Sequence, residues 1–278
     1  MNIFIGSLIR NCEWILPEFL KRILDLNYSK KDLTLCFILN DSIDKSEMIL
    51  HAFAERFQND YNKIIIAKSD FKEDAIGAGS SRLNGSDPLG RHTNASTGDR
   101  GKLYVNLADL RNLMMKIFTE RTEAEWMISI DSDILINPET VNLLIDGEKP
   151  SMRGAMVIND FLLNPDMGFN PLYRHCNVGI ETEKGIIRHK INYELNKIYD
   201  VDVTGACFSI HRKIVPLSSY KYHTWGEDAG YCVDLPEDTK IEWDTRCVQF
   251  DVMEKAMISQ EEEFWKELEN VRLCSSIS

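Results

Sequence analysis

The chain has 278 residues, of which 44% are hydrophobic and 27% charged, and its formal net charge is −12. This size and composition fit one large globular domain, or a domain with a short appendage. The negative charge argues against broad binding to nucleic acids or anionic membranes. No apolar stretch approaches the roughly 20 residues that cross a bilayer. Residues 1–6 lead directly into a strand without the basic segment of a signal peptide, so a cytoplasmic protein is expected.

The first half of the sequence alternates between strand-like and helix-like segments. Strands are predicted over residues 2–8, 33–39, 63–67, 126–131 and 152–158. Helices are predicted over residues 17–26, 44–57, 103–118 and 138–145. The helix over 103–118 has the clearest pattern, because its apolar residues recur at steps of four and three. This alternation predicts an α/β fold with a mainly parallel, doubly wound sheet.

Residues 126–134 are the most informative segment, because an apolar run ends abruptly at Asp131 and Asp133. The run is typical of a buried parallel strand, and open α/β sheets bind their ligands beyond the carboxyl ends of such strands. Two neighbouring carboxylates repel each other. A divalent cation that carries a phosphorylated substrate would offset the repulsion, because Mg²⁺ and Mn²⁺ prefer hard oxygen ligands. The alternative is that Asp133 caps the next turn and Asp131 is only solvated.

Three further segments and the cysteines depart from this alternation. Residues 74–102 are long, polar and glycine-rich, which predicts either a lid or an insertion without a role. Residues 159–200 show no assignable pattern, and residues 260–273 predict an acidic helix whose apolar stripe packs on the body. The seven cysteines are odd in number and none lies at CxxC spacing, which favours reduced, buried thiols over disulfides or zinc.

Six segments, in their order and spacing, resemble GT-A glycosyltransferases, and within that fold the Anp1/Mnn9-type and family-2-like enzymes. The segment over residues 126–133 is the closest and resembles the DxD motif of these enzymes. The other segments are residues 7–17, 39–46, 110–112, 203–214 and 225–231. The resemblance covers about residues 1–256.

The resemblance implies a single Rossmann-like GT-A domain over residues 1–256, with a mainly parallel central sheet flanked by helices. Its nucleotide-binding half would span about residues 1–136 and its acceptor half about residues 137–256. Residues 257–278 would form a C-terminal helical tail. The implied function is metal-dependent transfer of a sugar from a nucleotide-diphosphate sugar, UDP- or GDP-linked, to an unknown acceptor. The expected cofactor is Mn²⁺ or Mg²⁺.

The resemblance also implies the metal ligands. Asp133 would bind the metal directly, and Asp131 would bind it through water or hold the ribose or sugar of the donor. Enzymes of this group often add a metal-binding His after the last strand. Asp251 stands at that place here, so we expect it to be the third ligand, with an exposed acid at a strand end as the alternative.

The donor-binding residues that the resemblance implies are Ser7, Arg10, Asp41, Arg111, Asp131 and Gly205. Asp41 would contact the base or ribose, and its alternative is a turn-forming residue. Arg111 would help neutralise the diphosphate, and its alternative is a salt bridge on the helix surface. Gly205 would let the backbone approach the donor sugar, because glycine has no Cβ. Arg91, His92, Arg100 and Lys102 could fold over the phosphates as part of a lid.

Glu227 and Asp228 resemble the acidic pair near the acceptor. In an inverting enzyme one of them is the general base, and Asp228 is favoured. In a retaining enzyme the same carboxylate would stabilise the oxocarbenium-like centre. The alternative is a capping pair at a helix start. Two rival functions stay open, a degenerate GT-A scaffold and a sugar-phosphate nucleotidyltransferase. The missing metal His favours the scaffold, but the presence of Asp131, Asp133, Glu227 and Asp228 counts against it. The absence of a glycine-rich signature after Gly6 disfavours the nucleotidyltransferase.

Overall fold

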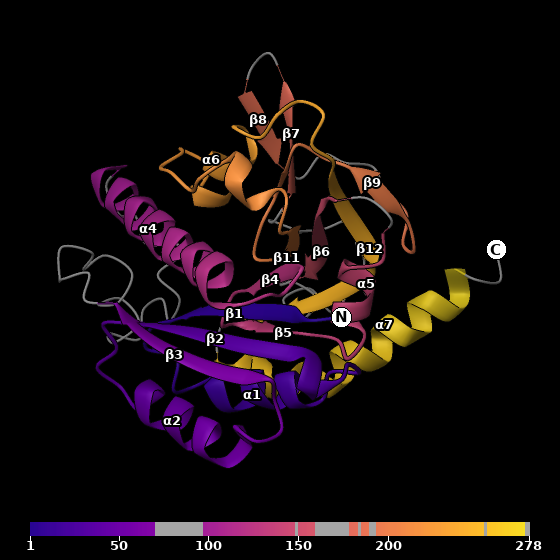
Figure 1. Ribbon diagram of the computed structural model, residues 1–278. Coiled ribbons are helices and arrows are strands. Elements are labelled where there is room, and N and C mark those ends of the chain that lie inside the picture. The colour runs from indigo at the N-terminus through magenta and orange to yellow at the C-terminus, as the bar shows by residue number, and fades with distance from the viewer. Residues whose placement is uncertain are drawn as a thin grey trace.

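The computed structural model describes residues 1–69, 97–147, 150–158, 178–182, 185–188, 193–252 and 255–275. These residues form a nine-stranded sheet with the strand order β3-β2-β1-β4-β11-β6-β12-β5, and β9 pairs with β12. Strands β10, β7 and β8 form a separate three-stranded sheet. Figure 1 shows α1 and α2 below the amino-terminal part of the large sheet and α4 above it.

The amino-terminal half is the predicted parallel layer. It contains β1 (Ile3–Ile9), α1 (Leu16–Leu24), β2 (Leu33–Asn40), α2 (Ser46–Phe57), β3 (Lys63–Ser69), α4 (Thr97–Arg121) and β4 (Trp126–Ile130). Strand β1 pairs in parallel with β2 and β4, and β2 pairs in parallel with β3. All residues of β2 and β4 are buried, as expected for strands that are covered on both faces.

The second half adds strands of both directions. It contains β5 (Ile134–Leu135), α5 (Thr140–Leu144), β6 (Met152–Ile158), β7 (Val178–Thr182), β8 (Gly185–Arg188), β9 (Ile198–Asp200), β10 (Val203–Thr204), β11 (Cys207–His211), α6 (Glu227–Cys232), β12 (Ile241–Asp251) and α7 (Glu261–Ser275). Strand β11 runs antiparallel to β4 and β6, while β12 is parallel to β6 and antiparallel to β5 and β9. Strands β1–β4, β6 and β12 therefore share one direction, and the predicted mainly parallel α/β sheet is confirmed.

Several predicted boundaries differ from the structure by one to six residues, and three of these differences have a clear consequence. The strand expected to reach residue 131 ends at Ile130, because the chain turns there and β5 pairs with β12 instead. The helix expected over 138–145 covers only Thr140–Leu144. Helix α4 begins at Thr97 rather than 103, so the last residues of the predicted polar loop are helical. Those residues carry no apolar periodicity, which is why the pattern missed them. The remainder of the loop, with Arg91 and His92, lies outside the described residues.

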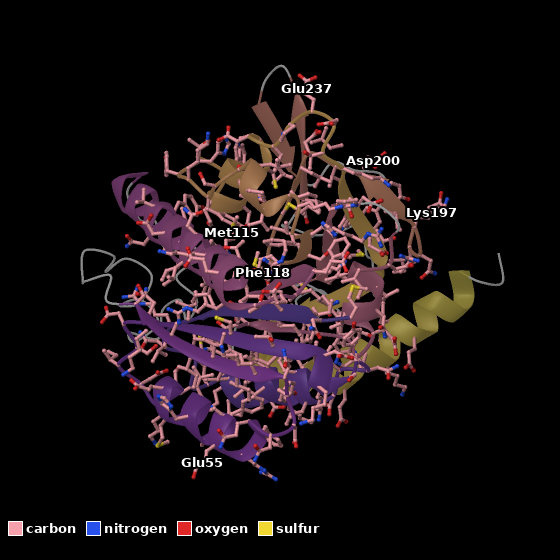
Figure 2. The ribbon with its side chains drawn as sticks, in the orientation of Figure 1. Glu55, Met115, Phe118, Lys197, Asp200 and Glu237 are labelled. Carbon is pink, nitrogen blue, oxygen red and sulfur yellow. The ribbon has the colours of Figure 1, made fainter. Side chains whose placement is uncertain are left out.

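The core lies between the sheet and its helices. Figure 2 shows Met115 and Phe118 of α4 in the interior, whereas Glu55 and Glu237 lie at the periphery. Phe118 is fully buried and packs at 5.4 Å, centroid to centroid, on Phe4 of β1. The cysteines whose side chains are described are buried, as predicted, and they are Cys12, Cys36, Cys207, Cys232 and Cys247. Among the described helices, none combines the length and the apolar character needed to cross a membrane.

The C-terminal helix α7 packs against the body, as its apolar stripe predicts. Phe264 is fully buried and stacks on Phe250 of β12 with ring centroids 4.4 Å apart. Glu261, at the start of α7, forms an ion pair with Arg22 of α1. The helix therefore covers β12 and ties both halves of the chain together.

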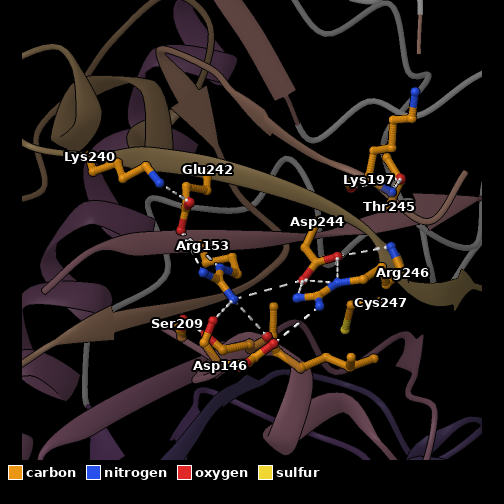
Figure 3. A network of polar contacts seen from close by, with 12 residues as sticks. Asp146, Arg153, Lys197, Ser209, Lys240, Glu242, Asp244, Thr245, Arg246 and Cys247 are labelled. Atoms are coloured by element: carbon orange, nitrogen blue, oxygen red, sulfur yellow. Dashed lines mark hydrogen bonds and ion pairs between the residues drawn. The ribbon is translucent and has the colours of Figure 1, made fainter. Parts of the chain in front are cut away.

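A buried ionic network holds β12 against β6 (Figure 3). Arg153 of β6 donates to Glu242 at 2.8 and 3.0 Å and also to the Leu143 carbonyl. Asp244 forms an ion pair with Arg246 at 2.7 Å. Arg153 forms ion pairs with both Glu242 and Asp244, and Asp244 also pairs with Arg246, so positive and negative side chains alternate along the network. This network surrounds the β-bulge of β12 between Asp244 and Val248, and its role is structural.

Candidate active site

The site is built at the carboxyl ends of the parallel strands, where the loops after β1 and β2 are joined by hydrogen bonds. Asn11 and Asp41, each just past a strand end, adopt left-handed backbone conformations with φ of 49° and 45°. These conformations suit Asn and Asp better than other non-glycine residues. The Asn11 side chain accepts a hydrogen bond from the backbone of Ile43 at 2.9 Å, and the Asn11 N–H donates to Ser42 at 3.1 Å. These bonds give the two loops a defined shape.

Three predicted donor-binding residues lie at this edge. Arg10 and Asp41 form an ion pair at 3.6 Å. Asp41 lies in a bend directly after β2 and stays partly exposed beside this cation. Ser7 is buried in β1 next to Phe37 of β2, and its hydroxyl makes no hydrogen bond within the described part of the chain. A buried hydroxyl without a partner is uncommon in proteins and calls for an explanation such as a ligand.

Arg111 is the centre of the site. It projects from α4, and its side chain is only 3% exposed. Its Nη1 donates to Ser129 of β4 at 2.6 Å, and its Nη2 donates to Asp131 at 2.7 Å. Its Nε lies 3.5 Å from Glu227 and 3.8 Å from Asp228. The structure thus brings the first Asp of the DxD segment and both members of the acidic pair to one guanidinium. The surface salt bridge considered for Arg111 is wrong, because the residue is buried.

The charges of this cluster are unbalanced, with three carboxylates around one cation. Burial raises the pKa of Asp228 to about 7, Arg111 opposes this rise, and Glu227 and Asp131 add to it. The pKa of Glu227 is also raised, first by burial, against the opposing effect of Arg111. Burial alone would lower the pKa of Arg111, but the three carboxylates outweigh it and keep the guanidinium charged. The pKa of Asp228 therefore lies near neutral pH.

The backbone at Gly205 and Ala206 connects Asp131 with Asp228. The Ala206 carbonyl accepts a hydrogen bond from the Asp131 N–H at 2.8 Å, and the Ala206 N–H donates to the Asp228 carboxylate. Asp228 Oδ2 lies where a side chain on Gly205 would stand, only 2.2 Å from an ideal Cβ. Glycine at 205 therefore makes room for the Asp228 carboxylate. This contact is a second reason for glycine there, besides the predicted approach of the donor sugar.

The acidic pair begins helix α6. Gly226 precedes it with φ of 107°, a conformation that other residues rarely adopt. Glu227 and Asp228 form the first turn of the helix, the N-cap is Gly226, and no side chain caps this helix start. The same turn also points both carboxylates at Arg111.

The predicted metal ligands do not form one cluster in the structure. Asp133 directly precedes β5, and Asp251 ends β12, where Asp251 pairs with Ile134 and the Val252 N–H donates to the Asp133 carbonyl at 2.9 Å. Both side chains are buried, so Asp251 is not the exposed strand-end acid of its alternative. Asp131 is held by Arg111 instead. Within the described ranges, no group of three or more His, Cys, Asp or Glu side chains is arranged to hold a metal ion.

Sequence reasoning missed several residues of the site. Ser129 was counted only as part of an apolar strand, yet its hydroxyl accepts the Arg111 hydrogen bond. Asn112 holds the backbone of Tyr220 through two hydrogen bonds, of 2.8 and 2.9 Å. The Leu110-Arg111-Asn112 segment was the available signal for Asn112. No local pattern marks Tyr220.

Comparison with known proteins identifies the family. A model of the Anp1 family matches residues 2–151, which is more than half of the chain. The chain belongs to the Anp1 family. No curated protein matches it. The predicted membership of the Anp1-type group is confirmed.

Solved structures support the same fold. The S. aureus TarS 1–349 structure in complex with UDP-GlcNAc aligns with a TM-score of 0.54 and 13% identity, over 91% of this chain and 59% of that one. The structure of GalNAc-T7 with UDP, GalNAc and Mn²⁺ aligns with a TM-score of 0.59 and 12% identity, over 91% of this chain and 44% of that one. In another structure of TarS 1–349, this chain spans 65% of the length. These likenesses confirm the GT-A fold of this Anp1-family chain.

Proposed function

We propose that this Anp1-family protein transfers a sugar from a nucleotide-diphosphate sugar to an acceptor. The observation that carries the proposal is the cluster in which Arg111 contacts Asp131 on the donor side and Glu227 and Asp228 on the acceptor side. The cluster lies where α/β sheets bind their ligands, beyond the carboxyl ends of β1 and β4. Family membership supports the same reaction class.

The donor would bind over the loops after β1 and β2. Asp41 and Arg10 would face the base or ribose, and the buried Ser7 hydroxyl would face the same pocket. Asp131, fixed by Arg111, would hold the ribose or the sugar. Arg111 itself has its nitrogens directed at Ser129, Asp131 and Glu227. Its main effect would be to hold the carboxylates in place, rather than to bind the diphosphate.

The raised pKa of Asp228, about 7, suits it to the role of general base. In an inverting reaction the acceptor hydroxyl transfers its proton to Asp228 and its oxygen bonds to the anomeric carbon. The bond from that carbon to the phosphate oxygen breaks, and its electron pair leaves with the nucleoside diphosphate. In a retaining reaction the same carboxylate would stabilise the oxocarbenium-like carbon. Arg111 would hold Asp228 in position in either case.

A divalent metal, Mn²⁺ or Mg²⁺, would take Asp133 and Asp251 as ligands. Both are buried carboxylates, and carboxylate oxygens are the ligands that these ions prefer. Asp131 would join them only through water, because Arg111 binds its carboxylate. When bound, the metal would stabilise the charge that develops on the leaving diphosphate. The GalNAc-T7 structure contains Mn²⁺ together with UDP.

The testing experiment is thermal unfolding with UDP, GDP, CMP and their sugars, first with Mn²⁺ and then with EDTA. UDP comes first, because the aligned TarS and GalNAc-T7 structures contain UDP or UDP-GlcNAc. A ligand at about 100 times its dissociation constant adds roughly 2.7 kcal/mol, a shift of a few degrees for a chain of this size. Asp133→Ala should abolish the shift. The matched control is Asp60→Ala, an exposed residue before β3 at the amino ends of the strands.

Two outcomes decide between the functions. A shift with one nucleotide class that EDTA and Asp133→Ala both remove, together with release of that nucleoside diphosphate from its sugar, supports a metal-dependent glycosyltransferase. The absence of any shift and of any turnover would contradict the proposal and favour a scaffold role. A cytoplasmic location and the division into donor and acceptor halves belong to this same proposal.

A further inference from the structure

Tyr220 is a buried residue whose backbone is held rigidly beside the site. It lies between β11 and α6 and is 3% exposed. Its N–H donates to the Asn112 side chain at 2.9 Å, and its carbonyl accepts from the same side chain at 2.8 Å. Asn112 is the next residue after Arg111 on α4. Tyr220 is therefore fixed to the helix that positions the central cation.

The ring of Tyr220 is fixed as well, on the helix that carries the acidic pair. It stacks on the ring of Tyr231, with centroids 4.6 Å apart and planes inclined by 23°. Tyr231 lies three residues after Asp228 on α6, about one turn away on the same side of the helix. The Tyr220 ring therefore packs beside the first turn of α6, which carries the Asp228 carboxylate.

The two stacked tyrosines differ in what their hydroxyls do. The Tyr231 hydroxyl donates to the Ile214 carbonyl at 3.4 Å. The Tyr220 hydroxyl is buried and makes no hydrogen bond within the described part of the chain. Leaving such a group unsatisfied destabilises a protein, so the Tyr220 hydroxyl needs a hydrogen-bond partner that the described residues do not supply.

Asp228 has an oxygen in the same condition. Its Oδ2 packs against Gly205, whereas its Oδ1 is buried, accepts no hydrogen bond from the described residues and lies 3.8 Å from Arg111. The Tyr220 phenol and the Asp228 carboxylate are both buried, and the charge of Asp228 acts on the phenol. Burial raises the pKa of Tyr220, the charge of Asp228 raises it further, and Arg111 opposes the rise. Tyr220 therefore stays neutral and keeps a proton that it can donate in a hydrogen bond.

The geometry points to a subsite for the acceptor hydroxyl, formed by Tyr220 and Asp228 Oδ1. This inference rests on the proposed glycosyltransferase function. An acceptor hydroxyl placed there would donate to Asp228 and accept from Tyr220, which satisfies both buried atoms together. An acceptor anion would be repelled by Asp131, Glu227 and Asp228, so the subsite takes a neutral alcohol, such as a sugar hydroxyl, rather than a carboxylate or phosphate.

The role of Tyr220 in the transfer follows from its retained proton. As Asp228 takes the proton of the acceptor hydroxyl, negative charge grows on the acceptor oxygen. The Tyr220 hydroxyl donates a hydrogen bond to that oxygen and does not itself ionise. Stabilisation of developing charge by a fixed donor of this kind lowers the barrier. Tyr220 therefore both positions the acceptor and assists the bond-forming step.

The test is Tyr220→Phe, which removes the hydroxyl and keeps the ring. The acceptor probes are methyl glycosides of glucose, galactose, mannose and N-acetylglucosamine, with water, measured as donor hydrolysis, as a further acceptor. We expect kcat/KM for the acceptor to fall at least tenfold. We expect the donor KM and the nucleotide-dependent thermal shift to stay within twofold of the wild type, and the Tm without ligand to be unchanged or higher.

The matched control is Tyr231→Phe, which removes the other hydroxyl of the same stack. It loses its hydrogen bond to Ile214, so its Tm should fall slightly while transfer and hydrolysis stay within twofold of the wild type. Wild-type transfer or hydrolysis rates in Tyr220→Phe would overturn the inference and leave the proposed function intact. A fall in Tm together with weaker donor binding would also overturn it, because Tyr220 would then be structural. If the wild-type protein neither binds a nucleotide nor turns over a donor, the proposed function itself fails.

Discussion

Replacement of Asp228 by Asn tests the electrostatics of the site directly. Asp228 shares Arg111 with Asp131 and Glu227, and burial raises its pKa to about 7. Asn has nearly the same shape and cannot ionise. The substitution therefore removes one negative charge from a cluster that holds three carboxylates against one guanidinium. It should change both the pH dependence of stability and the turnover of the donor.

The magnitude follows from the difference between the two pKa values. Below pH 3.8, the ordinary value, the carboxyl is protonated in both the folded and the unfolded chain. Between pH 3.8 and about 7 the unfolded chain releases the proton while the folded chain retains it, so the free energy of unfolding falls as pH rises. The pKa difference corresponds to at most about 4 kcal/mol. Part of this effect is shared with Glu227, whose pKa is raised by the same surroundings.

The assay is urea unfolding of the wild type and of Asp228→Asn between pH 5 and pH 8. The variant should gain stability relative to the wild type as pH rises, by a few kcal/mol at most. Asp60→Asn, at an exposed position, should follow the wild type at every pH. Parallel stability curves for the wild type and Asp228→Asn would refute the reasoning, because the buried charge would then carry no penalty.

Turnover provides the second measurement of the same variant. In the wild type, the rate of nucleoside diphosphate release should rise with pH to a plateau, with a midpoint near the pKa of Asp228, about 7. Asp228→Asn should reduce the rate by about 10²-fold or more, because general base catalysis contributes on this order. A variant with wild-type turnover would show that Asp228 is not the base, and Glu227 would be the next residue to change.

Three further substitutions test other contacts of the structure. Arg111→Ala leaves the buried carboxylates without their cation and should destabilise the fold by about 3–5 kcal/mol in urea unfolding, and a loss below 1 kcal/mol would contradict its central role. Gly205→Ala places a Cβ 2.2 Å from Asp228 Oδ2 and should reduce turnover more than it reduces Tm; unchanged turnover would show that the carboxylate can move away freely. Phe264→Ala empties the stack on Phe250 and should cost about 3–5 kcal/mol, whereas exposed Glu262→Ala should be neutral; equal unfolding midpoints would show that α7 is dispensable.

The amino-terminal layer could be predicted from the sequence because its signals are local. Strands β1 and β2 were each placed to within a residue, and β4 began as expected at Trp126. Their runs of consecutive buried apolar residues reflect burial on both faces, which a short window of sequence reports. The DxD segment was recognisable for the same reason, since two acids directly after such a run break the pattern sharply.

The second half resisted prediction because its strands pair over long distances. β5 has only two residues and joins β12, more than a hundred positions later, and β11 inserts between β4 and β6 in the opposite direction. The sequence of a two-residue strand, or of an irregular polar stretch, does not indicate which strand it will pair with. The pairing depends on which edges remain open after the parallel layer forms.

The sequence by itself determined the α/β class, the family resemblance and the identity of the acidic residues, because each depends on patterns within a few positions. The tertiary structure alone decided their arrangement. Arg111 meets Asp131, Glu227 and Asp228 through contacts that span 20 to 117 positions, and Gly205 makes room for Asp228 only because β10 and α6 are packed together. The pKa values of these groups depend on burial and on neighbouring charges, which exist only in the folded chain. The site is therefore a property of the packing of α4, β4 and α6.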